Sequence, residues 1–405
     1  MSPIPAPPWW QRDDLCYQNG QLYFAGHEVN QLAKLHSTPT FFYNAQRLND
    51  NIARLHTALQ HAGMTGKYRV LYAMKANRYA PLLTHLKSTG LVGIDACSPN
   101  EVDHAISCGF GPDEISFTNT SLSRSDYDRL NRIEGLSMQC DSLTCIRKWG
   151  ELGGGRNIGI RINPAIGLGR ADNDKLQYAG ADTTKFGIYR EQFAEAIALA
   201  KQYDLSITKI HFHTGCGYLT PQLDHWEDII QTCMWFVDQL ADTVEVVNVG
   251  GGLGVPHTEH DMPLDLDLWA AIVARNFKDK KVIVEIEPGD YIVKDSGILL
   301  LTVNTVEWKR DKTFVGVNGG FNIALEPAVY GLPFQPVPAM IRKGEPMKVT
   351  IAGHINEALD IFSRDTILTP IEEDDVLVLI NAGAYSTSMA SNHCMRGEFK
   401  EFLLY

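Results

Sequence analysis

The stretch YAMKAN, residues Tyr72–Asn77, follows the apolar run YRVL, residues Tyr68–Leu71, which predicts a short buried strand. Lys75 is therefore expected at or just beyond the C-terminal end of that strand, where an α/β barrel carries its chemistry. An isolated lysine is most often a surface charge, because lysines are seldom buried without a partner. The rest of the sequence has to decide between these two descriptions of Lys75.

Strand and helix patterns alternate from Pro39 to about residue 290. Ala45–Ala62 has apolar residues at helical spacing, and Asn100–Cys108 opens on a Ser-Pro-Asn-Glu sequence that resembles a helix cap. Such alternation implies parallel strands, and about eight strand–helix units predict a closed (β/α)8 barrel over residues 37–290. The predicted strands are Thr40–Tyr43, Val70–Met74, Gly93–Cys97, Glu114–Thr118, Ser137–Cys140, Asn157–Asn163, Ser206–His213, Val244–Val249 and Lys281–Glu287.

A second, β-rich domain is predicted after Gly289. A chain of 405 residues is too long for one ordinary core, so two domains are expected. We assign residues 1–36 and 291–405 to a mostly antiparallel β domain, because no long helices separate its strand-like runs. These runs are Gly297–Val306, Thr313–Val317, Met347–Ala352 and Asp375–Ile380.

Composition narrows the class of protein. The net charge of −12 argues against a nucleic-acid partner, which would require a basic face. The start of the chain lacks the pattern of a signal peptide, and the longest apolar runs, such as Ile298–Val303, are too short to span a bilayer. The eight cysteines form no Cys-x-x-Cys pair and no zinc spacing, so we expect a cytoplasmic enzyme with reduced thiols and no metal site.

Four further motifs contain residues that could bind a ligand. Gly250–Gly252 follow a valine-rich strand and could bring backbone N–H groups to an anion, although glycine clusters more often only form turns. His211 and His213 lie in the segment HFHTGCG and could otherwise be two core histidines. Glu287 opens the segment EPGD, which alone would be an exposed turn, and Tyr385 ends the segment NAGAY.

Together, and in their order along the chain, the motifs resemble those of the fold-type III pyridoxal-phosphate (PLP) decarboxylases, the family of diaminopimelate and ornithine decarboxylases. The resemblance extends from Pro39 to the C-terminus and implies that Lys75 holds PLP as a Schiff base and passes it to the substrate amine. It implies that His213 stacks on the cofactor ring. Glu287 would bond to the pyridine nitrogen and keep it protonated, so that the ring takes up the electrons left when CO2 departs.

The resemblance also implies the remaining cofactor contacts and a homodimer whose active sites are shared across the interface. Tyr385 would contact the phosphate, and Cys216 stands where the family usually has a serine, a stronger hydrogen-bond donor than a thiol. Tyr330 lies in a stretch that matches a family segment near the substrate. The other contacts that the resemblance implies are Asp95, Arg161, Gly250, Gly251, Gly252, Pro288, Gly289 and Asp290.

The chain departs from the family pattern at three positions. Asn356 replaces the cysteine that in relatives reaches across the dimer interface and protonates Cα after decarboxylation, and asparagine has no proton to give at neutral pH. Asp290 and Glu326 replace two arginines that hold the distal carboxylate of diaminopimelate in relatives. Another group must then act as the proton donor, and the candidates are His354, His393, Cys394, Lys75 itself and a bound water.

These departures predict the charge at the far end of the substrate. If Asp290, Glu326 and Glu357 face it together, they form an acidic cluster that a cationic group would stabilise. We therefore expect a basic amino acid or a derivative with a distal cation, and not diaminopimelate. The alternative is that Asp290 and Glu326 turn outward or pair with Arg161 or another arginine.

Two other functions remain open at this point. One is an amino-acid racemase on the same barrel, but alanine racemases of this fold pair the ring nitrogen with arginine, whereas Glu287 points to decarboxylation. The other is a non-catalytic homologue that only binds a regulator, which the missing cysteine at position 356 favours. The joint presence of Lys75, His213, Glu287 and Tyr385 argues against that second alternative.

Overall fold

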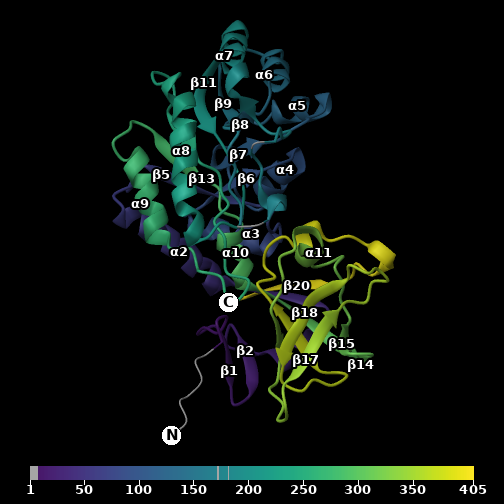
Figure 1. Cartoon of the computed structure of the whole chain (residues 1–405). Coiled ribbons are helices and arrows are strands. Elements are labelled where there is room, and N and C mark those ends of the chain that lie inside the picture. Colours follow the sequence, from purple (N-terminus) through teal and green to yellow (C-terminus); the bar gives the residue numbers. More distant parts are fainter. Residues whose placement is uncertain (1–7, 171–172, 181) are drawn as a thin grey trace. The chain divides into compact units, whose positions relative to one another are not determined.

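The computed structural model describes residues 8–170, 173–180 and 182–405. The chain forms two compact units (Figure 1). One is a barrel unit, Asn51–Val255 with Met262–Tyr291, and the other is a β-rich unit formed by the residues up to Asp50 with Pro256–Asp261 and Ile292–Tyr405. Among the described residues, no helix has the length and apolarity needed to cross a bilayer.

Eight parallel strands close the barrel, which confirms the predicted (β/α)8 architecture. They pair in the ring order β9-β11-β12-β13-β5-β6-β7-β8, and β8 pairs back to β9. A short strand, β10 (Ile188–Tyr189), is added beside β9. The ring strands are β5 (Tyr68–Ala73), β6 (Gly93–Ala96), β7 (Ile115–Thr118), β8 (Ser137–Cys140), β9 (Arg156–Asn163), β11 (Leu205–His211), β12 (Val246–Asn248) and β13 (Ile283–Ile286).

Helices follow the barrel strands and surround the ring (Figure 1). Several begin at a side-chain cap, because the first N–H groups of a helix lack partners within it. The Ser98 hydroxyl accepts the Glu101 N–H at the start of α4, and the Asp265 carboxylate accepts the Leu268 N–H at the start of α9. The helices after these strands are α3 (Ala80–Thr89), α4 (Pro99–Ser107), α5 (Arg124–Leu130), α6 (Leu143–Gly150), α7 (Phe193–Gln202), α8 (Leu223–Asp238) and α9 (Leu266–Phe277), and α2 (Ala45–His61) precedes β5.

The first strand predicted for the barrel region belongs to the other sheet. β4 (Thr40–Asn44) pairs antiparallel with β14 (Gly297–Lys309) and parallel with β20 (Lys400–Leu404). All five residues of β4 are buried, as they would also be in a barrel strand. Its apolar pattern therefore predicts a buried strand correctly but cannot say which sheet the strand joins.

The β-rich unit contains a mostly antiparallel sheet, as predicted. Its path runs β16-β19-β14-β15-β17-β18, with β4 and β20 attached through β14, and only the β15–β17 and β4–β20 pairs are parallel. A separate three-stranded sheet is formed by β1 (Leu15–Gln18), β2 (Gln21–Phe24) and β3 (His27–Glu28). Helix α1 (Val29–His36) follows β3, and the other strands are β15 (Lys312–Val317), β16 (Pro336–Pro338), β17 (Met347–Ala352), β18 (Ile361–Leu368) and β19 (Val376–Ile380).

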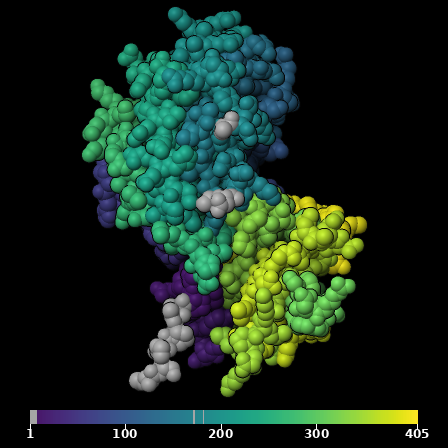
Figure 2. All heavy atoms as spheres, viewed as in Figure 1, coloured from purple at the N-terminus to yellow at the C-terminus, as the bar shows by residue number. Residues whose placement is uncertain are grey.

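One apolar core joins the two sheets of the β-rich unit. Leu15, Phe24 and Val29 from the first residues pack in the same cluster as Ile298 and Val378. Backbone bonds add to this contact, since the Leu22 N–H donates to the Ala339 carbonyl at 2.9 Å. In the space-filling view the green β14–β15 hairpin lies among the yellow-green atoms of the strands that pair with it (Figure 2).

Candidate active site

Lys75 follows β5 by two residues, at the C-terminal end of the barrel strands, as predicted. Backbone bonds tie its segment to two neighbouring strand ends: the Ala73 N–H donates to the Pro288 carbonyl, and the Met74 N–H donates to the Asp95 carbonyl, both at 3.2 Å. The side chain of Lys75 is therefore presented from a backbone that is fixed on both sides.

An aromatic side chain connects Lys75 to the second predicted residue, His213. The Lys75 Nζ lies 5.7 Å from the centroid of the Tyr178 ring, and the Tyr178 ring lies 4.9 Å from the His213 ring at an interplanar angle of 48°. The three side chains thus form one cluster above the barrel strands. Sequence reasoning missed Tyr178, because it lies in a long connection between β9 and α7 that carries no motif.

Gly250–Gly252 form a turn whose backbone is packed too closely against neighbouring segments to carry side chains. A Cβ at Gly250 would lie 2.6 Å from the Phe212 carbonyl oxygen, and a Cβ at Gly251 would lie 1.9 Å from the Glu287 carbonyl oxygen. Gly250 and Gly252 also have φ angles of +71° and +96°, which glycine adopts more easily than other residues. The Gly251 N–H donates to the His213 Nδ1 at 3.3 Å, so the glycine turn contacts the histidine.

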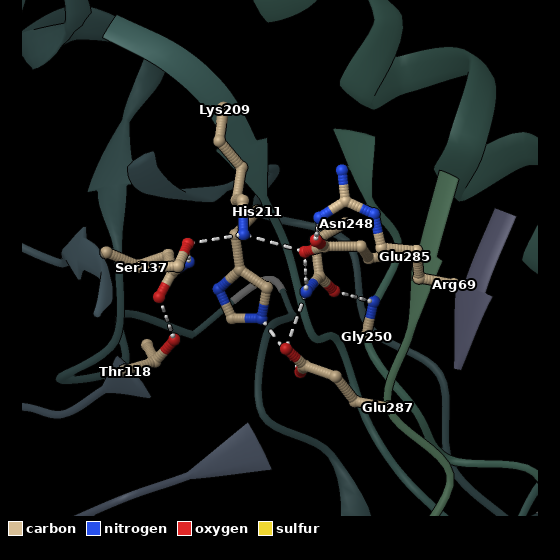
Figure 3. A network of polar contacts seen from close by, with 10 residues as sticks. Arg69, Thr118, Ser137, Lys209, His211, Asn248, Gly250, Glu285 and Glu287 are labelled. Carbon is tan, nitrogen blue, oxygen red and sulfur yellow. Dashed lines mark hydrogen bonds and ion pairs between the residues drawn. The ribbon is translucent and has the colours of Figure 1, made fainter. Parts of the chain in front are cut away.

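Glu287 is buried at the end of β13 and is held by two neutral side chains (Figure 3). Asn248 Nδ2 donates to Glu287 Oε1 at 2.6 Å, and His211 Nε2 lies 3.1 Å from Glu287 Oε2. Burial, together with the charge of Glu285, raises the pKa of Glu287 to about 7, although the bond from Asn248 opposes this shift. The carboxyl group is therefore balanced between its two protonation states near neutral pH.

Both histidines of the HFHTGCG segment are neutral at neutral pH. Burial lowers the pKa of His211 well below its ordinary value, and the charges of Arg161 and Lys209 add to this effect. Burial likewise lowers the pKa of His213, followed by the charges of Lys75 and Arg161. His211 belongs to β11 and acts on Glu287 inside the barrel, whereas His213 lies beyond the strand and faces Tyr178.

Three more predicted cofactor contacts lie in the barrel unit. Asp95 in β6 and Arg161 in β9 are buried, and burial together with the charge of Glu287 raises the pKa of Asp95. The Arg161 guanidinium lies 4.5 Å from the centroid of the Phe186 ring. Cys216 is partly buried, and its backbone N–H donates to the Leu176 carbonyl at 2.9 Å.

The remaining barrel residues of the prediction continue the segment after β13. Pro288 and Gly289 are buried directly after Glu287, and Asp290 begins the short helix α10 (Asp290–Val293). The Pro288 carbonyl is the group that accepts the Ala73 N–H near Lys75. The structure thus brings the Lys75, Gly250–Gly252 and Glu287 segments together through backbone contacts.

In the β-rich unit, Glu326 forms a buried ion pair that the sequence did not suggest. Its carboxylate Oε1 accepts a hydrogen bond from Lys294 Nζ, and the two side chains are 2% and 0% exposed. Lys294 Nζ also lies 6.0 Å from the centroid of the Tyr385 ring and 3.5 Å from His257 Nε2. Glu326 therefore pairs with a lysine of this chain. The sequence had predicted that it faces a substrate cation, turns outward or pairs with an arginine.

Asn356 and Glu357 lie on an exposed loop between β17 and β18. Glu357 Oε1 lies 3.2 Å from His393 Nε2. His354 Nδ1 lies 3.1 Å from Arg396 Nη1, and burial lowers the pKa of His354. Cys394 is exposed, and the Tyr330 hydroxyl lies 4.0 Å from Met389 Sδ.

Comparisons with known proteins agree with this site. Residues 48–294 match the family model described as "Pyridoxal-dependent decarboxylase, pyridoxal binding domain". The chain belongs to this family, the fold-type III PLP-dependent decarboxylases. A diaminopimelate decarboxylase of Methanothermobacter thermautotrophicus is 33% identical over 398 residues, which cover 95% of this chain and 91% of that protein.

Solved structures of this decarboxylase family support the same assignment. The diaminopimelate decarboxylase of M. jannaschii in complex with L-lysine has a TM-score of 0.86 at 25% identity, covering 97% of this chain and 93% of that one. That of Helicobacter pylori, also with L-lysine, has a TM-score of 0.82 at 25% identity and covers 93% and 94% of the two chains. The chain is thus similar to these decarboxylases over nearly its whole length.

The side chains of the decarboxylase barrel fit PLP, which is the cofactor of the family. Lys75 supplies an amine for the cofactor's aldehyde, and Gly250–Gly252 form a turn without side chains beside His213. His213 offers a neutral ring, and Glu287 offers a buried carboxyl for the pyridine nitrogen. The aldehyde, the ring and the pyridine nitrogen of the cofactor therefore each have a counterpart among residues that the structure brings together.

Proposed function

We propose that this decarboxylase removes the α-carboxylate of an amino acid whose far end carries a cation, and that Lys75, His213 and Glu287 are the residues that hold and tune its PLP. The single observation that carries the proposal is the buried position of Glu287 between Asn248 and His211, next to the Lys75 segment. Bound PLP supplies an electron sink for the carbon that loses CO2.

Glu287 is suited to a partner that carries a proton on a ring nitrogen. Near its pKa of about 7 the carboxyl exchanges a proton easily, and a cationic partner would favour its ionised form. Asn248 donates to Oε1 in either state, so the carboxyl keeps its orientation while its charge changes. We infer that Glu287 keeps the pyridine nitrogen protonated, and that the two neutral neighbours keep Glu287 from being neutralised by a competing cation.

His213 and Lys75 serve the other parts of the reaction. The pKa of His213 is held low, so its neutral ring can pack on an aromatic cofactor without adding a positive charge above it. Lys75 is the amine that binds the cofactor and that can afterwards hold or deliver a proton beside the reacting carbon. In relatives a cysteine donates the proton to Cα. In this chain the donor would be Lys75, a histidine or a water.

The charge at two positions supports a substrate with a distal cation. Where the family has arginines, this chain has Asp290 and Glu326, and Lys294 pairs with Glu326. Asp290 and Glu326 together carry −2 where two arginines would carry +2, and Lys294 offsets one of the two negative charges. A distal carboxylate would lose both of its cationic partners, whereas a distal amine or guanidinium would gain an anionic one, at roughly 1.5–3 kcal/mol for each charge-assisted hydrogen bond.

Diaminopimelate is the second candidate substrate. It is favoured by the 33% identical relative from M. thermautotrophicus, which is a diaminopimelate decarboxylase. The pairing of Glu326 with Lys294 also favours it, because this pairing removes one of the three carboxylates expected to repel a distal carboxylate. The two candidates differ in the charge at the far end and can be separated directly.

The deciding experiment measures CO2 release from a panel of L- and D-amino acids by the PLP-loaded protein. The panel contains lysine, ornithine, arginine and meso-diaminopimelate. We expect the highest kcat/KM for a member with a cationic far end, and Asp290→Asn should reduce that preference while changing the rates of uncharged substrates less. A highest kcat/KM for meso-diaminopimelate would overturn the substrate proposal and leave decarboxylation intact.

We also propose a homodimer with shared active sites. The support is the family resemblance and the exposure of the loop that carries Asn356, the position from which relatives reach the neighbouring site. Mixing inactive Lys75→Ala protein with a protein inactivated in this loop would restore part of the activity if sites are shared. Light scattering that gives the mass of a single chain would contradict the dimer.

A further inference from the structure

A second charged cluster lies inside the barrel beneath Glu287. Lys209 Nζ lies 2.7 Å from Glu285 Oε2, and the two side chains are 7% and 3% exposed. Arg69 Nη1 approaches the other oxygen of Glu285 at 3.3 Å, and the Arg69 side chain is 55% exposed. Buried charges of this kind are costly unless they are paired, and the Glu285 carboxylate lies between two cations.

Asn248 links this cluster to the cofactor site (Figure 3). Its Nδ2 donates to Glu287 Oε1 at 2.6 Å and to Glu285 Oε2 at 3.2 Å, so one amide group binds both carboxylates. Glu285 belongs to β13 and Glu287 follows its last residue, so the two are two positions apart, and residues at this spacing point to the same face of an extended chain. The Asn248 side chain is oriented in turn by the Gly250 N–H, which donates to its Oδ1 at 2.9 Å.

Other charged and titratable groups also act on Glu287, and among them His211 contacts it directly. Lys75 and Asp95 lie at the upper strand ends, and Arg161 projects from β9, while His211 from β11 is neutral. Lys209 and Glu285 differ from these groups because they have no counterpart in the expected chemistry of PLP. They are the charged pair whose purpose the proposed function does not explain.

The Glu285 pair borders a cavity at the end of the barrel opposite to Lys75. Arg69, Ser137 and Glu285 line a cavity of about 270 Å³ at the N-terminal ends of the strands. Ser137 belongs to the same network, because its hydroxyl accepts from Lys209 Nζ at 2.7 Å. The cluster thus spans the barrel interior from this cavity up to Asn248.

We propose that Lys209 and Glu285 are positioning residues that set the proton affinity of Glu287 through Asn248, and thereby the electron demand placed on bound PLP. This inference rests on the proposed role of Glu287. The anion of Glu285 disfavours ionisation of Glu287, and the cation of Lys209 favours it. The two residues therefore act on Glu287 with opposite signs although they form one ion pair.

The test titrates the carboxyl groups of the cofactor-free protein by infrared difference spectroscopy, with 13C-glutamate labelling and Glu287→Gln to assign the Glu287 band. Glu285→Gln should lower the pKa of Glu287 by about one unit or more, because it removes an anion and leaves a cation. Lys209→Met should raise the pH at which the Glu285–Glu287 pair takes up its first proton, by a similar amount. Lys209→Arg should leave the titration close to native.

Two further variants keep the test decisive if the buried single variants fail to fold. Arg69→Gln removes a half-exposed cation from Glu285 and should shift the titration in the same direction as Lys209→Met, by a smaller amount. Lys209→Met combined with Glu285→Gln removes both charges and should titrate between the single variants. On the PLP-loaded protein, the same order should appear in the pH dependence of the cofactor absorption band.

Shifts of opposite sign for Glu285→Gln and for the cation variants support the inference. The inference is overturned if the pKa of Glu287 does not shift in these variants. It is also overturned if all shifts have the same sign and follow only a loss of stability, in which case the pair has a structural role alone. Because the infrared titration needs neither cofactor nor substrate, its failure is distinct from a failure of the proposed decarboxylation, which the release of CO2 reports.

Discussion

Residues predicted for the site are held differently in the two units of the chain. In the barrel, the segments of Lys75, Gly250–Gly252 and Glu287 lie on neighbouring strand ends and touch through backbone atoms. In the β-rich unit, Glu326 is buried against Lys294, and Asn356 lies on an exposed loop. The barrel therefore fixes the chemistry that any family member needs, and two of the three departures from the family pattern, Glu326 and Asn356, lie in the β-rich unit, while Asp290 lies at the edge of the barrel unit.

The largest effect that this comparison predicts is a loss of turnover when Lys75 is replaced. Lys75→Ala should reduce turnover on the order of 10³-fold or more, because the same amine binds the cofactor and can move a proton at Cα. The near-visible absorption band of the PLP-loaded protein should disappear together with its sensitivity to borohydride. Lys201→Ala, on the exposed face of α7, is the control and should behave as the native protein. Near-native activity of Lys75→Ala would refute the assigned role.

The β-rich unit should respond most strongly to a change at Lys294. Lys294→Met leaves the Glu326 carboxylate buried without its ammonium partner, and the loss of one partner of a buried pair costs about 3–5 kcal/mol. Lys294→Met with Glu326→Leu should recover most of this loss, since apolar replacements of both partners are often tolerated. Lys312→Met, at an exposed pair with Asp365, should cost less than about 1 kcal/mol. Urea unfolding measures the free energy of unfolding of all three variants.

Equal losses of unfolding free energy for Lys294→Met and Lys312→Met would mean that burial does not distinguish the two ion pairs. A double variant no more stable than Lys294→Met would mean that the partners of Lys294 other than Glu326 carry its contribution. Either result would weaken the contrast between a preserved barrel site and an internally neutralised β-rich unit.

Glu287 should make the cofactor-free barrel less stable as pH rises. Its folded pKa of about 7 lies above the ordinary carboxyl value of 4.5, so the fold favours the neutral form. The cost of ionisation is absent below pH 4.5 and complete above pH 7, and it amounts to about 3 kcal/mol. Glu287→Gln should therefore be more stable than the native protein at pH 8 and should lose this advantage near pH 5.

Thermal unfolding of the cofactor-free proteins at both pH values measures this difference. Glu195→Gln, an exposed change of the same charge on α7, should show no such pH dependence. A native protein as stable as Glu287→Gln at pH 8 would mean that Glu287 is not held in its neutral form, and would remove the basis for its adjustable proton affinity.

The sequence predicts the barrel and its motif residues because both follow local patterns. Alternating strands and helices indicate parallel strands, and each motif occurs where a predicted strand ends. The place of β4 could not be predicted, since its pairing with β14 and β20 joins residues more than 250 positions apart. Lys294 was missed for a similar reason, because its partner Glu326 is a distant residue with no shared pattern.

The interior network of the barrel did leave a signal in the sequence. Lys209, His211 and His213 alternate along one strand segment, and Glu285 and Glu287 alternate along another. Polar residues at a spacing of two within otherwise apolar strands point to one face, and in a closed barrel that face is either the interior or the helix layer. Ionisable side chains cannot all lie under helices without partners, so the pattern indicates a polar barrel interior.

The smallest predicted effect concerns Asn356, which lies on the exposed loop after β17. The Asp360 carboxylate accepts the Phe321 and Ile355 N–H groups at 2.6 Å, so the loop is anchored independently of the Asn356 side chain. Asn356→Cys should therefore change the stability by less than about 0.5 kcal/mol. If the loop reaches the reacting carbon of a neighbouring site, the thiol adds a proton donor and raises turnover by less than about tenfold, because the native donor still operates.

Ala358→Cys is the matched control, since residue 358 lies two positions further along the same exposed loop. It adds a thiol with similar exposure but at a position that the family pattern does not assign to proton transfer. A gain in turnover, or a change in the stereochemistry of deuterium uptake at Cα, for Asn356→Cys alone would place this loop at the reacting carbon. If neither variant changes rate or product, position 356 does not act there, and the proton donor has to be sought among the residues at the barrel strand ends.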